Sequence, residues 1–207
     1  IMTIKKVGFK KKTALAVTRN VQLLLTGAFC RLIATHFSDA DNIVIPVLKK
    51  NVYSDDQTKT KILIQPHYKW ETAIELLRPA VIIKRETLTT QKIAIGDGFG
   101  ENLDEGLPKT KFINCAHTVY CLSEQGGSSE ILGEEVFQML LEFAPAIRED
   151  FSLLSLEISS VGEVSKIKEF DEHFGVPITI TWVRQNNWAL KYDGPWLQDL
   201  ETSTTLL

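Results

Sequence analysis

The chain has 207 residues, 44% of them hydrophobic and 24% charged, which suits one globular domain or one domain with extended arms. Its formal net charge of -3 excludes a protein that binds polyanions over its whole surface. Three cysteines, an odd number, argue against a disulfide framework and favour a reducing compartment during synthesis.

Charged residues are unevenly distributed between the two ends of the chain. Residues 1–12 form a basic N-terminal arm that includes Lys10, Lys11 and Lys12. Residues 193–207 form an acidic C-terminal tail that contains Trp196. Such ends are commonly solvated and flexible. Alternatively, the two ends contact neighbouring subunits, DNA or a channel wall. Trp196 is expected to pack either on a neighbouring subunit or on its own domain. A single domain is expected between them, at residues 13–192.

The first predicted element is a helix over Thr13–His36, where apolar residues recur at steps of three and four. Its most apolar run, Val21–Ala34, is shorter than the ~20 residues of a membrane span. Gln22 and Arg31 also interrupt that run. We therefore expect a buried helix and no membrane partner. Gly27, near its centre, is expected to mark a close packing contact.

Shorter elements follow this helix. Ile43–Leu48 is β-branched but contains Pro46, which predicts an edge strand or an extended connector. Strands are predicted at Lys61–Gln65 and Ala80–Arg85, and a short helix at Trp70–Arg78 lies between them.

A long loop is predicted over Thr87–Lys109, and loops of this length in compact domains are usually functional or disordered. Its glycine-rich acidic part contains the candidate functional residues Gly96, Asp97, Gly98, Phe99, Gly100, Glu101, Asp104 and Glu105. The glycines lack the lysine and hydroxyl of a phosphate-binding loop, and they do not open a helix. The carboxylates suit a divalent cation, but an EF-hand pattern is absent. A solvated, flexible acidic loop is the favoured interpretation, and a loop that faces a channel or a partner is compatible with it.

The second half of the chain predicts one helix and several strands. A strand at Lys111–Leu122 precedes a helix at Ser128–Ile147, in which Pro145 favours a kink or an early end. Phe143 is counted in the buried stripe of that helix. Alternating strands follow at Leu153–Val161 and Val176–Val183. A turn at Asn186–Asn187 then leads into a last strand at Trp188–Tyr192.

The residue types of Cys115, His117 and Cys121 suit a metal site, but their spacing does not. They share one face of one strand, where Cys115 and Cys121 are about 20 Å apart, so no single metal ion joins them. Packing in the core or in an interface is expected instead. The sequence shows no histidine or serine motif of a hydrolase, so it predicts no catalytic residue, no metal site and no cofactor.

These elements together predict an α+β fold. Its mixed, mostly antiparallel sheet is expected to be covered on one side by two main helices, the first helix and the helix at 128–147. Polar residues fall at turns and solvent-facing positions, which favours an assembly subunit over an enzyme.

The order of elements over residues 60–185 resembles that of the tail terminator and tail-completion (neck) proteins of long-tailed bacteriophages. The resemblance rests on the strand AVIIKRET (80–87), a glycine-bearing loop and the strand KFINCAHTVYCLSE (111–124). The helix SSEILGEEVFQMLLEF (128–143) and the strands LLSLEISSVGEV (153–164) and VPITITWV (176–183) complete it.

This resemblance implies a structural virion protein made in the host cytoplasm. It implies a homo-oligomeric ring, typically a hexamer, that caps the tail tube and joins the tail to the head connector. The expected partners are further copies of the chain, the tail tube protein, the head connector or stopper protein, and DNA passing through the channel. The loop at 87–109 is then the candidate channel or partner loop.

Other functions stay open from the sequence. The chain is alternatively another neck or head–tail connector subunit, or a monomeric binding module that uses the loop at 87–109. A metal-dependent nuclease that uses the acidic loop is the enzyme alternative.

Overall fold

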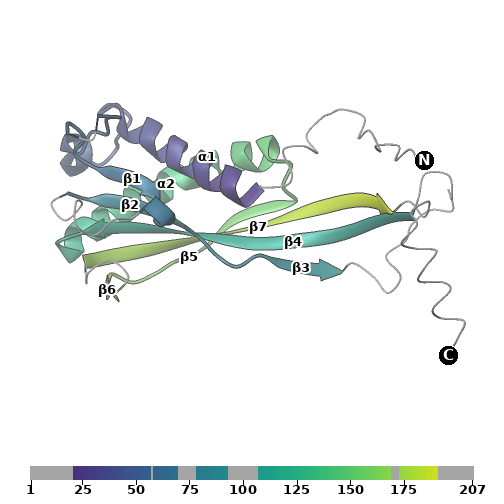
Figure 1. The fold of residues 1–207 in the computed structure, drawn as a ribbon. Coiled ribbons are helices and arrows are strands. Elements are labelled where there is room, and N and C mark those ends of the chain that lie inside the picture. Colours follow the sequence, from purple (N-terminus) through teal and green to yellow (C-terminus); the bar gives the residue numbers. More distant parts are fainter. Residues whose placement is uncertain (1–20, 57, 70–77, 93–106, 169–172, 191–207) are drawn as a thin grey trace, which may run out of the picture.

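The computed structural model describes residues 21–56, 58–69, 78–92, 107–168 and 173–190 (Figure 1). The strands in these ranges are β1 (Leu63–Pro66), β2 (Ala80–Arg85), β3 (Thr89–Lys92), β4 (Leu107–Ser123), β5 (Ser155–Val161), β6 (Ser165–Ile167) and β7 (His173–Leu190). The helices are α1 (Val21–Phe37) and α2 (Gly126–Asp150), with short 3-10 helices η2 (Pro46–Lys50) and η3 (His67–Lys69). No helix in these ranges is long and apolar enough to cross a membrane.

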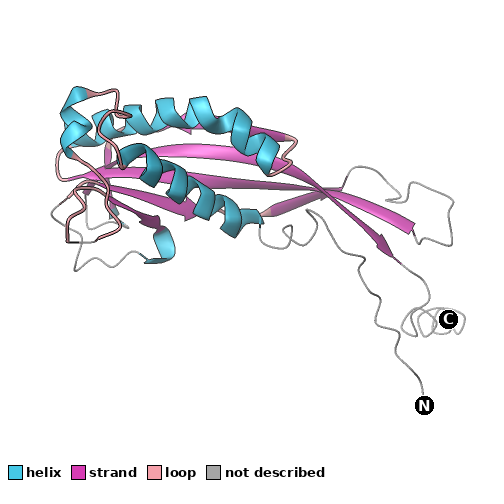
Figure 2. Ribbon diagram, turned by 90° about the horizontal axis from the view of Figure 1, so that it is seen from above, coloured by secondary structure: helices cyan, strands magenta, loops and turns pink. Residues whose placement is uncertain are grey.

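The described strands form a single seven-stranded sheet in the order β1-β2-β4-β7-β5. In addition, β3 pairs with β4 and β6 pairs with β7. Only the β1–β2 pairing is parallel among these strands. Figure 2 looks onto the helices and shows α1 and α2 lying across the same face of the sheet. The predicted α+β class, with a mostly antiparallel sheet and two helices on one side, is confirmed.

Strand alternation explains which residues form the core. On β4, Cys115, Val119 and Cys121 face the helices, and they belong to a large buried cluster that includes α1 and α2 side chains. A smaller cluster lies on the other face and contains Leu63, Ala80, Ile82 and Leu122. Because β2 contributes to both clusters, its first four residues are all buried, which accounts for the continuous apolar run AVII.

The long β4–β7 ladder distinguishes this fold. The two strands pair without interruption from Leu107 opposite Leu190 to Ser123 opposite Phe174. The predicted turn at Asn186–Asn187 is therefore wrong, because both asparagines pair with β4 and tertiary pairing overrides their turn preference. Figure 1 shows the far part of this ladder, together with β3, extending beyond the helices as an arm.

Several predicted boundaries need correction. The loop at 87–109 is shorter at both ends, because 89–92 form β3 and β4 begins at Leu107. Ile43–Leu48 is not a strand, since Pro46 starts η2 with a fixed φ that suits a first helical turn. Residues 13–20 of the first predicted helix and 70–77 of the short helix lie outside the described residues.

Helix α2 continues through Pro145 to Asp150, so the expected early end is wrong. Pro145 and Leu141, whose carbonyl loses its helical partner, both lie on the exposed side of the helix. Water can satisfy that carbonyl there. Phe143 is 41% exposed and is not part of the buried stripe, which continues at Ile147 instead.

Two helical glycines differ in their surroundings, and this difference gives a prediction. A Cβ at Gly133 would meet the buried Val176 at 3.1 Å, whereas a Cβ at Gly27 has no atom within 4 Å. Gly27 is therefore not the close contact that the sequence suggested. We expect Gly27→Ala to stabilise the protein by about 1 kcal/mol through helix propensity. Gly133→Ala should destabilise it by about 1 kcal/mol through overpacking. Chemical denaturation of both variants tests this, and equal signs would contradict it.

Candidate functional site

A buried polar network joins α1 to the centre of the sheet at His117, which is fully buried. The indole Nε1 of Trp182 donates to His117 Nδ1 at 3.1 Å. Because an indole only donates, Nδ1 carries no proton, and the neutral ring is protonated at Nε2. His117 Nε2 lies 3.0 Å from Thr26 Oγ1 and 3.2 Å from Gln22 O, so both of its ring nitrogens are satisfied within the core.

Burial lowers the pKa of His117 to about 4, because a charged imidazole loses its hydration there. Phe29 packs edge-on against the imidazole ring with centroids 5.4 Å apart, which keeps the site apolar. The ring is therefore neutral at pH 7, and both of its nitrogens are engaged within the core. This arrangement positions α1 on the sheet and does not suit general acid–base catalysis.

The neighbouring thiols are also unsuited to nucleophilic chemistry. Burial raises the pKa of Cys30 to about 12 and raises the pKa of Cys115 and Cys121. All three cysteines are free. Gln22 Nε2 donates to Cys115 Sγ, which ties the start of α1 to the sheet. The expectation that Cys115, His117 and Cys121 pack in the core is confirmed.

A second buried polar group, Glu135, fastens α2 to the segment after α1. Its side chain is 2% exposed. Glu135 Oε1 accepts from His36 Nε2 at 2.8 Å and from the Val44 backbone N–H at 2.9 Å. Glu135 Oε2 accepts from the Ile45 backbone N–H at 2.9 Å. The carboxylate thus substitutes for the backbone partners that this irregular segment lacks.

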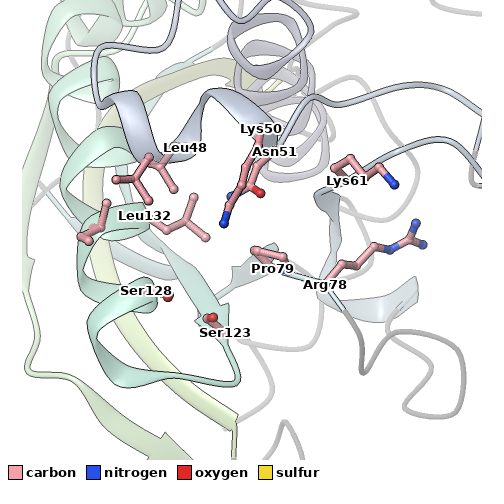
Figure 3. Close-up of a pocket in the computed structure, with 11 residues that line it drawn as sticks. Leu48, Lys50, Asn51, Lys61, Arg78, Pro79, Ser123, Ser128 and Leu132 are labelled. Atoms are coloured by element: carbon pink, nitrogen blue, oxygen red, sulfur yellow. The ribbon is translucent and has the colours of Figure 1, made fainter.

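An open cavity of about 460 Å³ lies beside the first turns of α2 (Figure 3). Its walls combine apolar, cationic and hydroxyl groups from η2, the β1–β2 region and the start of α2. The lining residues are Val47, Leu48, Lys50, Asn51, Lys61, Arg78, Pro79, Ser123, Ser128, Ile131 and Leu132. Figure 3 shows Lys50, the last residue of η2, and Asn51, which follows it, extending into the space between Leu132 and Pro79. The charged ends of Lys61 and Arg78 lie at its outer rim.

The residues that the sequence proposed as functional lie outside the described residues. They are Gly96, Asp97, Gly98, Phe99, Gly100, Glu101, Asp104 and Glu105 of the loop, and Lys10, Lys11, Lys12 and Trp196 of the arms. Among the described residues, no group of three His, Cys, Asp or Glu side chains is placed to hold a metal ion.

The His117 network, the contacts of Glu135 and the cavity beside α2 were not predicted from the sequence. A glutamate at 135, among the buried positions Leu132, Val136 and Met139 of one helix, was a signal for a paired internal carboxylate. His117 was placed on the correct face, but its partners come from α1 and β7, far away in the sequence. No pattern in the sequence predicts that Asn51 lies near the start of α2.

Comparison with known proteins adds no relative. Neither a protein-family model nor a curated protein matches this sequence.

Proposed function

We propose that this chain is a structural subunit that assembles head-to-tail into a ring, as the tail terminator proteins that its element order resembles do. In this proposal the ring belongs to the neck of a virion, with a tail tube protein on one side and a head connector or stopper protein on the other. Another neck subunit built on the same ring is the nearest alternative.

The observation that carries this proposal is the arm formed by β3 and the far part of β4 and β7. The end of α1 nearest to the arm is tied to Cys115, and β4 continues from there for eight further residues to Leu107. Within the described part of the chain, this arm consists of β3, β4 and β7 with no helix packed on it. Such an arm is marginally stable in water, so a partner surface is expected to cover it. Phe112 and Ile113 on this arm are half-buried and offer apolar contact area to a neighbour.

Exposed apolar side chains at opposite edges of the sheet also support a ring. Helix α1 packs over β1 and β2, and near this edge Leu23 is 45% and Tyr68 68% exposed. Helix α2 packs over β4, β7 and β5, and at that edge Leu154 is 51% exposed. A cyclic ring uses two different surfaces of each subunit, and one apolar surface at each edge meets that need.

The ring proposal is tested by mixing two variants, each of which carries a charge in one of the two apolar edge surfaces. Light scattering of the wild type across a concentration range, alone and with tail tube protein, is expected to show assembly beyond the monomer. Tyr68→Asp and Leu154→Asp should each remain monomeric. An equimolar mixture should form a dimer, because one variant keeps the surface that the other lacks.

Asn42→Asp is the matched control, because it adds the same charge at an exposed position that belongs to neither apolar surface, and it should assemble like the wild type. A wild type that stays monomeric even with tail tube and connector proteins would overturn the proposal. A mixture of the two variants that stays monomeric would exclude these two surfaces as a head-to-tail pair.

A further inference from the structure

The cavity beside α2 has the charge and polarity of a binding site for an acidic, partly apolar peptide. Leu48, Leu132 and Pro79 form apolar walls, and three cationic side chains stand around them. Among the described residues, none that lines the cavity is acidic. Within the described residues neither Lys50 nor Lys61 forms an ion pair, and Arg78 Nη1 donates to the Thr60 carbonyl at 3.2 Å. The first turn of α2 adds a positive dipole end at Ser128.

Asn51 is the most informative residue of this cavity. It is 8% exposed, and its side-chain amide points into the cavity (Figure 3). Its backbone N–H donates to Leu48 O at 2.8 Å, but within the described part of the chain no hydrogen bond engages its side chain. A buried amide without a partner is costly and rare in folded proteins. An external backbone group that pairs with it would account for its presence.

We propose that this cavity binds the acidic C-terminal segment of a second copy of the chain, centred on residues 195–201. This segment reads Pro-Trp-Leu-Gln-Asp-Leu-Glu, so apolar side chains alternate with acidic ones. Trp196 and Leu197 suit the apolar walls, and Asp199 and Glu201 suit the cationic rim. A peptide backbone also supplies the donors and acceptors that the Asn51 amide lacks.

The C-terminal segment of the same copy is too short to reach this cavity. Ser123, in the cavity wall, is opposite Phe174, and β7 runs from there to Leu190, about 53 Å along the strand. Trp196 lies only six residues beyond Leu190, a stretch that reaches about 22 Å when fully extended. Trp196 therefore contacts this cavity only in a neighbouring subunit. This inference deepens the ring proposal, because it supplies a second contact between adjacent copies.

The binding site is tested with a synthetic peptide of residues 191–207 and the full-length double variant Tyr68→Asp/Leu154→Asp, which removes both ring surfaces. Binding of a peptide with a fluorescent label at its N-terminus, followed by the anisotropy of the label, is expected to be saturable. Lys50→Glu/Lys61→Glu should weaken it at least about tenfold. Lys49→Glu, the exposed neighbour in η2 that does not line the cavity, should change it less than about twofold.

Asn51→Leu separates binding from folding. Removing an unpaired buried amide should leave thermal stability unchanged or raised, while peptide binding weakens about tenfold. Absence of binding, equal binding of a scrambled peptide, or full competition by millimolar inorganic phosphate would overturn the inference, the last two by showing a general anion site. The double variant lacks both apolar edge surfaces, so it measures peptide binding separately from the contacts between those edges. Peptide binding to a protein that forms no ring would therefore refute only the ring.

Discussion

Replacing Glu135 by alanine is expected to lower the free energy of unfolding by about 3–5 kcal/mol, a large effect for a single substitution. The carboxylate is 2% exposed and accepts hydrogen bonds from His36 and from two consecutive backbone N–H groups. Alanine leaves all three donors without a partner and opens a void between α2 and the segment after α1. Urea denaturation monitored by tryptophan fluorescence measures the change.

Glutamine at position 135 separates shape from charge. Its carboxamide fills the same space, but its NH₂ group faces at least one of the three donors, so Glu135→Gln should cost about 2 kcal/mol. The neighbouring Glu134 is exposed and accepts only from Gln138 among the described contacts. Glu134→Ala should therefore cost less than about 0.5 kcal/mol. A cost for Glu135→Ala within 1 kcal/mol of that control would show that the segment 43–45 finds other partners.

The second large effect is a loss of stability in acid that originates at His117. The pKa of this imidazole is about 4 in the folded protein, below the ordinary value of 6.5. Between these values the unfolded chain binds a proton that the folded protein does not, so stability falls as the pH is lowered from about 6.5 to about 4. The contribution of His117 amounts to about 3 kcal/mol between pH 7 and pH 4. Above pH 7 it is constant.

A comparison with His117→Gln isolates this contribution, because carboxylates titrate in both proteins and cancel in the difference. The variant should be less stable at pH 7, where it loses the network with Trp182 and Thr26. Its stability should depend less on pH, so the gap to the wild type should narrow by about 3 kcal/mol at pH 4. A gap that stays constant between pH 7 and pH 4 would mean that His117 is protonated without cost.

Local patterns in the sequence predict the elements of this fold but not their partners. Apolar residues alternate with polar ones around Leu156 in β5 and around Ile178 and Trp182 in β7, and this alternation predicts both strands and their buried faces. The apolar stripe of α2 predicts the side of the helix that faces the sheet. These signals are strong because one period applies along a whole element. The ends of β4 and β7 carry weaker signals: Asn186 and Asn187 favour a turn locally, and only pairing with a distant strand keeps them extended.

The cavity beside α2 illustrates why sites are harder to predict than elements. Asn51, Arg78 and Ser123 belong to three separate segments, and none of them lies in a recognisable motif. These residues come together only because β1 pairs in parallel with β2 and because the end of β4 packs near α2. Both are properties of the tertiary fold. Glu135 was predictable as a buried carboxylate, but its backbone partners lie in a segment that the sequence predicts as extended chain.

The β4–β7 ladder has a consequence for the order in which the molecule forms. Its pairs are nested: Ser123 opposite Phe174 encloses the shortest stretch of chain, and every step toward Leu107 opposite Leu190 encloses a longer one. Loop closure costs more entropy as the enclosed chain lengthens, so pairing begins in the helix-covered body and proceeds outward. The arm is then the last part to form and the first to open. A nascent chain therefore presents no complete arm to its neighbours, and association through the arm waits until the core beneath the helices has closed.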